Sequence, residues 1–368
     1  MVSASRQATS KTSPPGSIPI IDGHNDTLLS LARTGRSFFD RTDEGHIDLP
    51  RAREGGLAGG FFAVWLPDPE RAPPPGGALD PALMSQRDAD VATMPPVMEL
   101  AHAQGAAMAA MARFFQLERE AAGAVQVVRT VAELRECVAT GVFALELHIE
   151  GAEPIDPGLD ALEVFYQAGV RSLGIVWSRS NAFGHGVTTQ FPGSPDTGQG
   201  LTGAGKALVR ACNRLGIMID LSHLNEAGFW EVAKLSDAPL VATHSNAHAL
   251  SPTPRNLTDK QLDAIRDSEG MVGVNFHVGF LRPDGERNVE TPLTVMADHV
   301  DYLVNRLGID KVGFGSDFDG ATMPSTLSSC AELPALLDVL RERGYDDPAL
   351  RLLGFENWLR VLGRTWRA

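Results

Sequence analysis

The chain has 368 residues, of which 43% are hydrophobic and 21% are charged, and this composition suits one large globular domain. Its formal net charge is −14, from 46 acidic and 32 basic residues, and it contains no run of Lys or Arg long enough to neutralise a phosphate backbone. Nucleic acid and anionic membranes are therefore excluded as expected partners.

Cysteine usage and the N-terminal segment indicate the compartment. Cys137, Cys212 and Cys330 form no Cys-x-x-Cys pair and no even-numbered framework of the secreted type. Residues 1–17 are rich in Ser, Thr, Lys and Pro and contain no apolar core typical of a signal peptide. We expect a disordered N-terminal tail and a soluble, cytoplasmic protein without a membrane anchor.

Short apolar or β-branched runs, each followed by a polar loop and a helical pattern, recur along the chain. This alternation is typical of a parallel barrel. We predict an α/β fold with one (β/α)8 TIM-barrel domain over residues 18–368. The eight runs are Pro19–Asp22, Gly60–Trp65, Val142–Ile149, Ser172–Trp177, Ile217–Leu221, Leu240–Thr243, Val272–Phe276 and Val312–Ser316.

Helical patterns lie between these runs, and one connection is oversized. The gap at about 66–140 holds a Pro/Gly-rich stretch, Pro67–Pro81, and an Ala/Met-rich helical pattern, Val97–Ala122. We interpret it as an insertion after strand 2, over the barrel mouth, rather than as a second domain. The other predicted helices are Gly203–Leu215, Glu226–Leu235, Thr258–Ser268 and Thr291–Leu307, the third with an Asn-Leu-Thr-Asp start that can cap a helix.

In such barrels the active site is built at the carboxyl ends of the strands, and polar residues follow several of the predicted strands. After the first run, His24 and Asp26 are two residues apart, so they point to the same face of an extended chain and can bind one metal. The alternative is a loop histidine with an Asx-turn partner.

The third run ends in an acidic residue, Glu150, whose carboxylate can bridge two cations. Gly151 follows it and permits close backbone approach, which favours Glu150 over Glu146 and Glu153. His148 and Glu146 are two and four residues before Glu150, so their side chains point to the same face of the strand. Either can therefore hydrogen-bond to the ligands without binding the metal.

Histidines follow the fifth and sixth runs, and an aspartate follows the eighth. With His223 and His244, the candidate ligands number five, all of types that zinc prefers. Asp317 stands at the mouth, where it can take a proton from metal-bound water and pass it to the leaving amine. Asp319 is the rival, although its Asp-Gly context suits a turn.

Together these motifs resemble those of the renal, or membrane, dipeptidases and their bacterial relatives, within the amidohydrolase-like barrels. The resemblance extends over nearly the whole chain. The motifs on which it is based are Asp22–Thr27 (DGHNDT), Glu150-Gly151, Ile219–His223 (IDLSH), Thr243–Ser245 (THS), Pro254–Leu257 (PRNL), Gly315–Gly320 (GSDFDG) and Asn357–Leu362 with Gly354 before it.

The resemblance implies a binuclear zinc site. His24 and Asp26 would bind the first zinc, Glu150 would bridge, and His223 and His244 would bind the second. The implied reaction is attack of a metal-bridging hydroxide on the peptide bond of free L-Xaa-L-Xaa dipeptides and of L-Xaa-D-Xaa dipeptides. The resemblance also implies a homodimer.

Two substrate contacts depend on the same resemblance. Arg255, which alone would be interpreted as a surface loop residue, would clamp the C-terminal carboxylate with its guanidinium fork. Mammalian members of the family have a carbonyl-polarising histidine after the fourth strand, where this chain has Trp177. His185, Arg179 and Asn181 are the candidates to replace it; we favour His185, with Asn181 as a further substrate contact.

Two rival functions stay open at this point. One is another amidohydrolase-type amide hydrolase on the same barrel, although such enzymes usually pair His-x-His with a bridging modified lysine, and no lysine of this chain ends a predicted strand. The other is a non-catalytic binding protein that retains the metal pocket. The sequence does not distinguish zinc from manganese or cobalt.

Overall fold

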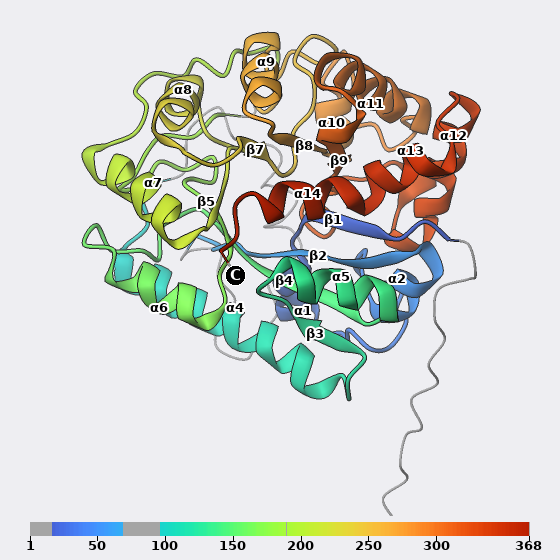
Figure 1. The fold of residues 1–368 in the computed structure, drawn as a ribbon, viewed down its shortest axis with the longest axis horizontal. Helices are drawn as coiled ribbons and strands as arrows, with labels where there is room; N and C mark the ends of the chain where they lie inside the picture. The colour runs from blue at the N-terminus through green and yellow to red at the C-terminus, as the bar shows by residue number, and fades with distance from the viewer. Residues whose placement is uncertain (1–16, 69–95, 189, 368) are drawn as a thin grey trace, which may run out of the picture.

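The computed structural model describes residues 17–68, 96–188 and 190–367. Its strands form one sheet with the order β2-β1-β9-β8-β7-β6-β5-β4-β3, and all of these pairs are parallel. Strand β2 also pairs with β4, which closes a barrel and leaves β3 outside the ring (Figure 1). The strands are β1 (Ile20–Asn25), β2 (Leu57–Val64), β3 (Val125–Val127), β4 (Phe143–Glu150), β5 (Ser172–Gly174), β6 (Met218–Asp220), β7 (Val241–Ala242), β8 (Met271–Val274) and β9 (Val312–Phe314).

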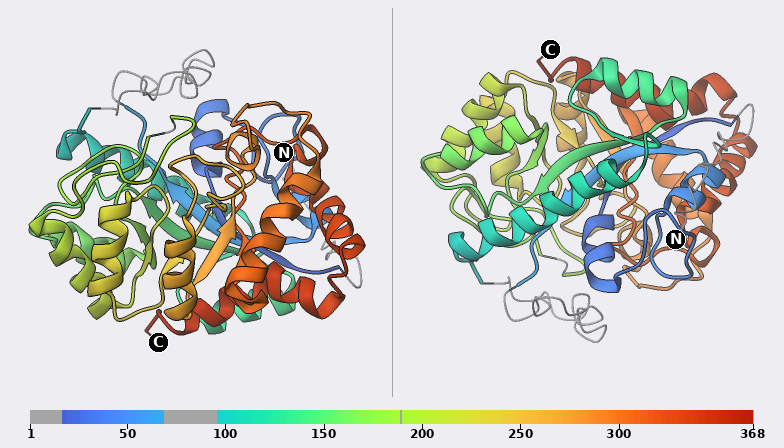
Figure 2. Two further views of the ribbon diagram at one scale, coloured as in Figure 1. Left: turned by 90° about the horizontal axis from the view of Figure 1, so that it is seen from above. Right: turned by 90° about the horizontal axis from the view of Figure 1, so that it is seen from below.

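Helices surround the barrel on its outer side, as Figures 1 and 2 show. Two of them, α7 and α8, have the predicted bounds, and α9 begins at the predicted cap, where Thr258 and Gln261 form a capping box. The helices are α1 (Thr27–Thr34), α2 (Leu49–Gly55), α4 (Leu100–Glu120), α5 (Val131–Thr140), α6 (Asp160–Ala168), α7 (Gly203–Leu215), α8 (Glu226–Leu235), α9 (Asp259–Asp267), α10 (Val278–Leu281), α11 (Leu293–Leu307), α12 (Leu333–Glu342), α13 (Asp347–Arg351) and α14 (Asn357–Gly363).

The C-terminal helix α14 closes the amino-terminal end of the barrel. The buried indole of Trp358 lies 5.0 Å from the ring of Phe61 and donates a hydrogen bond to the Phe314 carbonyl. A Cβ at Gly23 would lie 2.4 Å from this indole, so strand β1 needs glycine there. Trp358 and Phe61 belong to a buried apolar cluster, whereas the polar candidate residues lie at the carboxyl ends of the strands.

The predicted fold class is confirmed. Each of the eight predicted runs overlaps one of the eight strands of the closed barrel. Strand β3 is not among the predicted runs, because three residues are too few to show an alternating pattern.

Residues 1–16 of the predicted tail, 1–17, and most of Pro67–Pro81 lie outside the described residues. The described part of the predicted insertion consists of α4, β3 and α5. Phe114 of α4 packs on Phe62 of β2 with ring centroids 6.5 Å apart, so α4 lies against the outer side of the barrel wall. The division of the chain into a tail and one domain with an insertion stays a prediction. Across the described ranges, no helix combines the length and apolar character needed to cross a membrane.

Candidate active site

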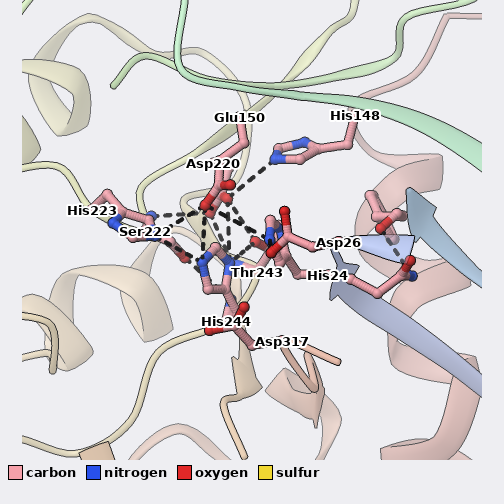
Figure 3. A network of polar contacts seen from close by, with 12 residues as sticks. His24, Asp26, His148, Glu150, Asp220, Ser222, His223, Thr243, His244 and Asp317 are labelled. Carbon is pink, nitrogen blue, oxygen red and sulfur yellow. Dashed lines mark hydrogen bonds and ion pairs between the residues drawn. The ribbon is translucent and has the colours of Figure 1, made fainter. Parts of the chain in front are cut away.

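Six polar side chains selected from the sequence stand at the carboxyl ends of barrel strands. Since all strands of the barrel run parallel, these ends meet at one mouth, and Figure 3 shows the side chains converging there. The six residues are His24 and Asp26 at β1, Glu150 at β4, His223 after β6, His244 after β7 and Asp317 after β9.

Glu150 lies at the centre of this group. Its Oε1 atom is 3.0 Å from Nε2 of His223 and 3.5 Å from Nε2 of His244. The same oxygen is 3.7 Å from Nε2 of His24, and that nitrogen is 3.8 Å from Oδ2 of Asp26. The carboxylate therefore faces candidate ligands contributed by three different strand ends.

The five residues form two sets that each suit a metal ion. His24, Asp26 and Glu150 make one set, and Glu150, His223 and His244 make the other. Within each set the ligand atoms lie within 4.8 Å of one another, and all five residues are buried. Imidazole and carboxylate groups are ligands that zinc and similar divalent ions accept, and Glu150 belongs to both sets.

The electrostatics of His24 indicate that a cation fits here. Both of its ring nitrogens are buried without a hydrogen-bond partner among the described residues. Burial disfavours the charged ring, but the carboxylates of Glu150 and Asp26 outweigh this and raise the pKa of His24 to about 10. Burial and the neighbouring His24 hold the pKa of His244 well below its ordinary value. A bound divalent ion would balance the carboxylates and could be coordinated by one nitrogen of the His24 ring.

Two buried aspartates that the sequence analysis did not select support this group. Asp220 of β6 accepts hydrogen bonds from the backbone nitrogen and hydroxyl of Thr243 at 2.8 and 2.6 Å, and its Oδ2 lies 3.8 Å from Nδ1 of His244 (Figure 3). Asp22 of β1 accepts from the backbone nitrogen and hydroxyl of Ser316 at 2.6 and 2.8 Å. Both tie neighbouring strand ends together. Strand parity with His24 is the signal that could have identified Asp22.

Asp220 also enters a third possible ligand set, with His24 and His244. Its carboxylate is already engaged with Thr243, and Oδ1 also accepts from the backbone nitrogen of Ser222 at 3.0 Å. These bonds favour a supporting role for Asp220, in which it does not bind the metal but, together with Thr243, orients the His244 ring.

The backbone at two of the mouth residues is unusual. His223 has φ 67° and Asp317 has φ 62°, in the left-handed region that costs a non-glycine residue about 1–3 kcal/mol. Such conformations persist where the surrounding structure enforces them, and they concentrate at functional sites. Here they make sharp turns directly after β6 and β9.

Asp317 and its rival Asp319 have different surroundings. Asp317 is partly exposed at the mouth, and its Oδ2 accepts a hydrogen bond from Asn275 at 3.0 Å. Burial raises the pKa of Asp317 above its ordinary value, against the opposing effect of the His24 charge. Asp319 is buried, and its carboxylate is occupied by three donors, namely the Thr27 hydroxyl, the Arg36 guanidinium and the His46 backbone nitrogen. The geometry therefore favours Asp317 for proton transfer.

Arg255 is buried next to the candidate ligands and is not a surface residue. Its guanidinium lies 3.2 Å from the carbonyl oxygen of His244, to which it donates, and stacks 5.2 Å from the ring centre of Phe280. Burial lowers its pKa, while Asp317 and Glu150 favour its charge. A cation in this position is suited to an anionic group of a bound molecule.

The loop after β5 places its predicted residues differently. The side chain of Asn181 is engaged within the loop, since its Nδ2 donates to the carbonyl of Ile175 and its Oδ1 accepts from the backbone of Phe183. The ring of His185 is half-buried and its Nδ1 pairs with the Ser180 hydroxyl at 3.0 Å. Neither contact reaches the five ligands.

The competing residues of β4 and its loop also have definite positions. His148 stands behind the ligands, with Nε2 3.7 Å from Oδ2 of Asp220. Glu153 lies 3.6 Å from the buried guanidinium of Arg179, and its pKa is raised to about 7 because burial outweighs that contact. Both oxygens of Glu146 are buried without a hydrogen-bond partner among the described residues.

Comparisons with known proteins agree with this site. The model of the membrane dipeptidase family, peptidase family M19, matches residues 16–367. Two solved structures, each 51% identical with a TM-score of 0.89 over 95% of this chain, are a dipeptidase of family M19 and a metallo peptidase from Rhodobacter sphaeroides. They are covered over 99% and 100% of their lengths, and the latter is bound to a phosphinate mimic of L-Ala-D-Ala.

A more distant likeness concerns the fold alone. An amidohydrolase from Pseudomonas aeruginosa is 23% identical, with a TM-score of 0.71, covering 95% of this chain and 96% of its own. The family match and the buried His, Asp and Glu ligands together establish that this chain belongs to the membrane dipeptidase family, peptidase family M19, and is a metallo-dipeptidase.

Proposed function

We propose that the protein is a binuclear zinc dipeptidase that hydrolyses free dipeptides of the L-Xaa-L-Xaa and L-Xaa-D-Xaa types. The observation that carries the proposal is the sharing of Glu150 between two buried ligand sets. A carboxylate has two oxygens, so one residue can serve two ions. His24 and Asp26 would complete one zinc site, and His223 and His244 the other.

Bound zinc ions would supply Lewis acidity for the peptide carbonyl and would lower the pKa of water. The residues of the chain then have separate tasks. Arg255 holds the substrate's C-terminal carboxylate beside His244, and its burial strengthens this charge pair. Asp317, oriented by Asn275, accepts a proton from the attacking water and returns it to the leaving amine.

The loop after β5 would contact the scissile carbonyl. His185 keeps its predicted role in this proposal, and because its Nδ1 faces the Ser180 hydroxyl, Nε2 is the atom that would reach the substrate. Asn181 is the weaker candidate, since its amide already bonds to Ile175 and Phe183.

The substrate class rests on the comparisons. A protein that shares 51% of its residues with this chain binds a mimic of L-Ala-D-Ala, which supports acceptance of a D-residue at the C-terminal position. A homodimer and a cytoplasmic location stay predictions from the sequence.

The proposal is tested by incubating the purified protein with matched L-Ala-L-Xaa and L-Ala-D-Xaa dipeptides, with metal content determined on the same sample. We expect free amino acids from both series, about two metal ions per chain, and loss of activity on chelation. Zinc, manganese and cobalt, returned separately, would then identify the metal that restores the highest rate.

Dipeptides with a C-terminal amide serve as the control, because they offer Arg255 no carboxylate and should be cleaved poorly. Two metal ions per chain without cleavage of any dipeptide would instead indicate a different amide substrate.

A further inference from the structure

Three bulky apolar residues form a small cluster at the mouth, separate from the main core. Leu29 and Trp65 are each 8% exposed, and the partly exposed Trp177 packs against them. Each follows the end of a different strand: Leu29 lies in α1 after β1, Trp65 directly follows β2, and Trp177 follows β5. We call these three residues the aromatic wall.

The two indoles of the wall pack on each other and lie beside a candidate metal ligand. The rings of Trp65 and Trp177 meet edge to face, with centroids 5.4 Å apart. The Trp177 ring is 5.9 Å from the ring of His223. These contacts hold an apolar surface next to ligands that are otherwise polar and charged.

Arg179 also contacts Trp177. Its guanidinium carbon lies 5.6 Å from the Trp177 ring centre. Arg179 is almost fully buried and pairs with Glu153 and with Asp68, which comes after β2. The guanidinium beside Trp177 is therefore itself held by carboxylates from two neighbouring strand ends.

The wall and Arg255 stand on opposite sides of the mouth. Around the closed barrel the strands follow in the order β1, β2, β4, β5, β6, β7, β8, β9. The wall belongs to β1, β2 and β5, whereas Arg255 follows β7 and stacks on Phe280, which follows β8. Two candidate ligands connect them: His223, beside Trp177, has its Nε2 3.1 Å from Nε2 of His244, and Arg255 donates to the His244 carbonyl. If Arg255 holds the carboxylate, the other end of the dipeptide lies toward the wall.

We infer that the aromatic wall binds the side chain of the N-terminal residue of the dipeptide and makes the enzyme prefer apolar side chains there. The inference rests on the proposed function and assigns the side-chain selectivity to Trp177 in particular. An indole surface gains free energy by covering apolar groups. The charged groups closest to Trp177 are already paired with one another, Arg179 with Glu153 and Asp68, so a charged side chain would lose its water without a comparable gain. The C-terminal side chain, near Arg255, lies outside its reach.

The test compares two substrate series in wild type and in Trp177→Ala. In the first series the C-terminal residue is constant: L-Leu-L-Ala, L-Asp-L-Ala and Gly-L-Ala. In the second the N-terminal residue is constant: L-Ala-L-Leu and L-Ala-Gly. We expect wild type to favour L-Leu-L-Ala within the first series. In Trp177→Ala, the kcat/KM for L-Leu-L-Ala divided by the kcat/KM for Gly-L-Ala should be about tenfold lower than in wild type. The ratio within the second series should change less than twofold.

Two further variants complete the design. Trp177→Phe keeps an aromatic surface and should retain most of the selectivity. Trp230→Ala makes the same substitution on α8, where the indole is 37% exposed, and should leave both ratios unchanged.

An equal fall of kcat/KM for all substrates in Trp177→Ala would overturn the inference, as would a change confined to the second series. If wild type cleaves neither series, the proposed function itself fails, which is a different result from cleavage with unaltered selectivity.

Discussion

Gly320 follows Asp319 in the turn after β9 and packs against the first ligand set. A Cβ at this position would lie 1.9 Å from Oδ2 of Asp26 and 2.6 Å from Oδ1 of Asp317. The backbone of Gly320 is not in the left-handed region, so the strain of an alanine there comes from close contacts and not from its backbone conformation. Gly320→Ala is thus a direct probe of where the Asp26 carboxylate lies.

The size of the effect follows from the distances. Real Cβ contacts stay above 3.0 Å, so the Asp26 oxygen has to retreat by about 1 Å. A displacement of that size at a catalytic centre costs on the order of 100-fold in rate, or about 2.7 kcal/mol of activation free energy. We expect kcat/KM to fall by about this factor and metal content to fall below that of wild type, since Asp26 belongs to one ligand set only.

The assay is kcat/KM on one dipeptide, with metal content and thermal unfolding of the same preparation. Gly105→Ala in helix α4 is the matched control, because apart from the local helix backbone the described residues place no atom within 4 Å of its added Cβ. It should stabilise the protein by about 1 kcal/mol without affecting catalysis. If Gly320→Ala keeps full metal content and activity within threefold of wild type, Asp26 does not occupy the position described.

Four more predictions concern single groups. Asp317→Asn should bind metal normally but lower kcat by about 10²–10⁴. An unchanged kcat would show that Asp317 does not transfer the proton. Arg255→Lys should lower kcat/KM by about 10- to 100-fold for free dipeptides and far less for their C-terminal amides. The pKa of His24 is raised to about 10, so in the metal-free protein its ring carries a proton at neutral pH, and metal binding displaces this proton. The apparent metal affinity measured by titration calorimetry should therefore rise about tenfold per pH unit. An affinity that does not change with pH would contradict this prediction. Burial raises the pKa of Glu146 well above its ordinary 4.5, so the folded protein favours the protonated carboxyl group. The resulting contribution to the free energy of unfolding is complete below about pH 4.5 and is lost as the pH rises through the folded-state pKa. With increasing pH, metal-free Glu146→Gln should therefore gain stability relative to wild type, by up to about 1.4 kcal/mol per pH unit in denaturant unfolding.

The sequence by itself identifies most of this fold and much of its site. Eight apolar runs separated by helical patterns are visible without a structure, because a parallel strand buried on both faces must be apolar along its length. The polar residues that interrupt this pattern at strand ends, such as Glu150 and His244, stand out for the same reason. The short strand β3 does not, since Val125–Val127 is no longer than a chance apolar run.

Only the tertiary structure shows which of these polar residues meet. Glu146, His148 and Glu150 have the same strand parity, yet only Glu150 faces the ligands of three other strand ends. Asp22 and Asp220 are found through their bonds to Ser316 and Thr243, which belong to the neighbouring strand ends. No local pattern encodes such contacts.

The same holds for Arg255 and for the aromatic wall. By sequence Arg255 lies in a polar loop, but the fold buries it against His244 and Phe280. Trp65 and Trp177 are more than a hundred residues apart and meet because β2 and β5 both pair with β4. Sequence periodicity indicates which face of a helix or strand a residue occupies. The closure of the barrel determines which residues lie next to it at the mouth, and the chemistry of the site depends on those neighbours.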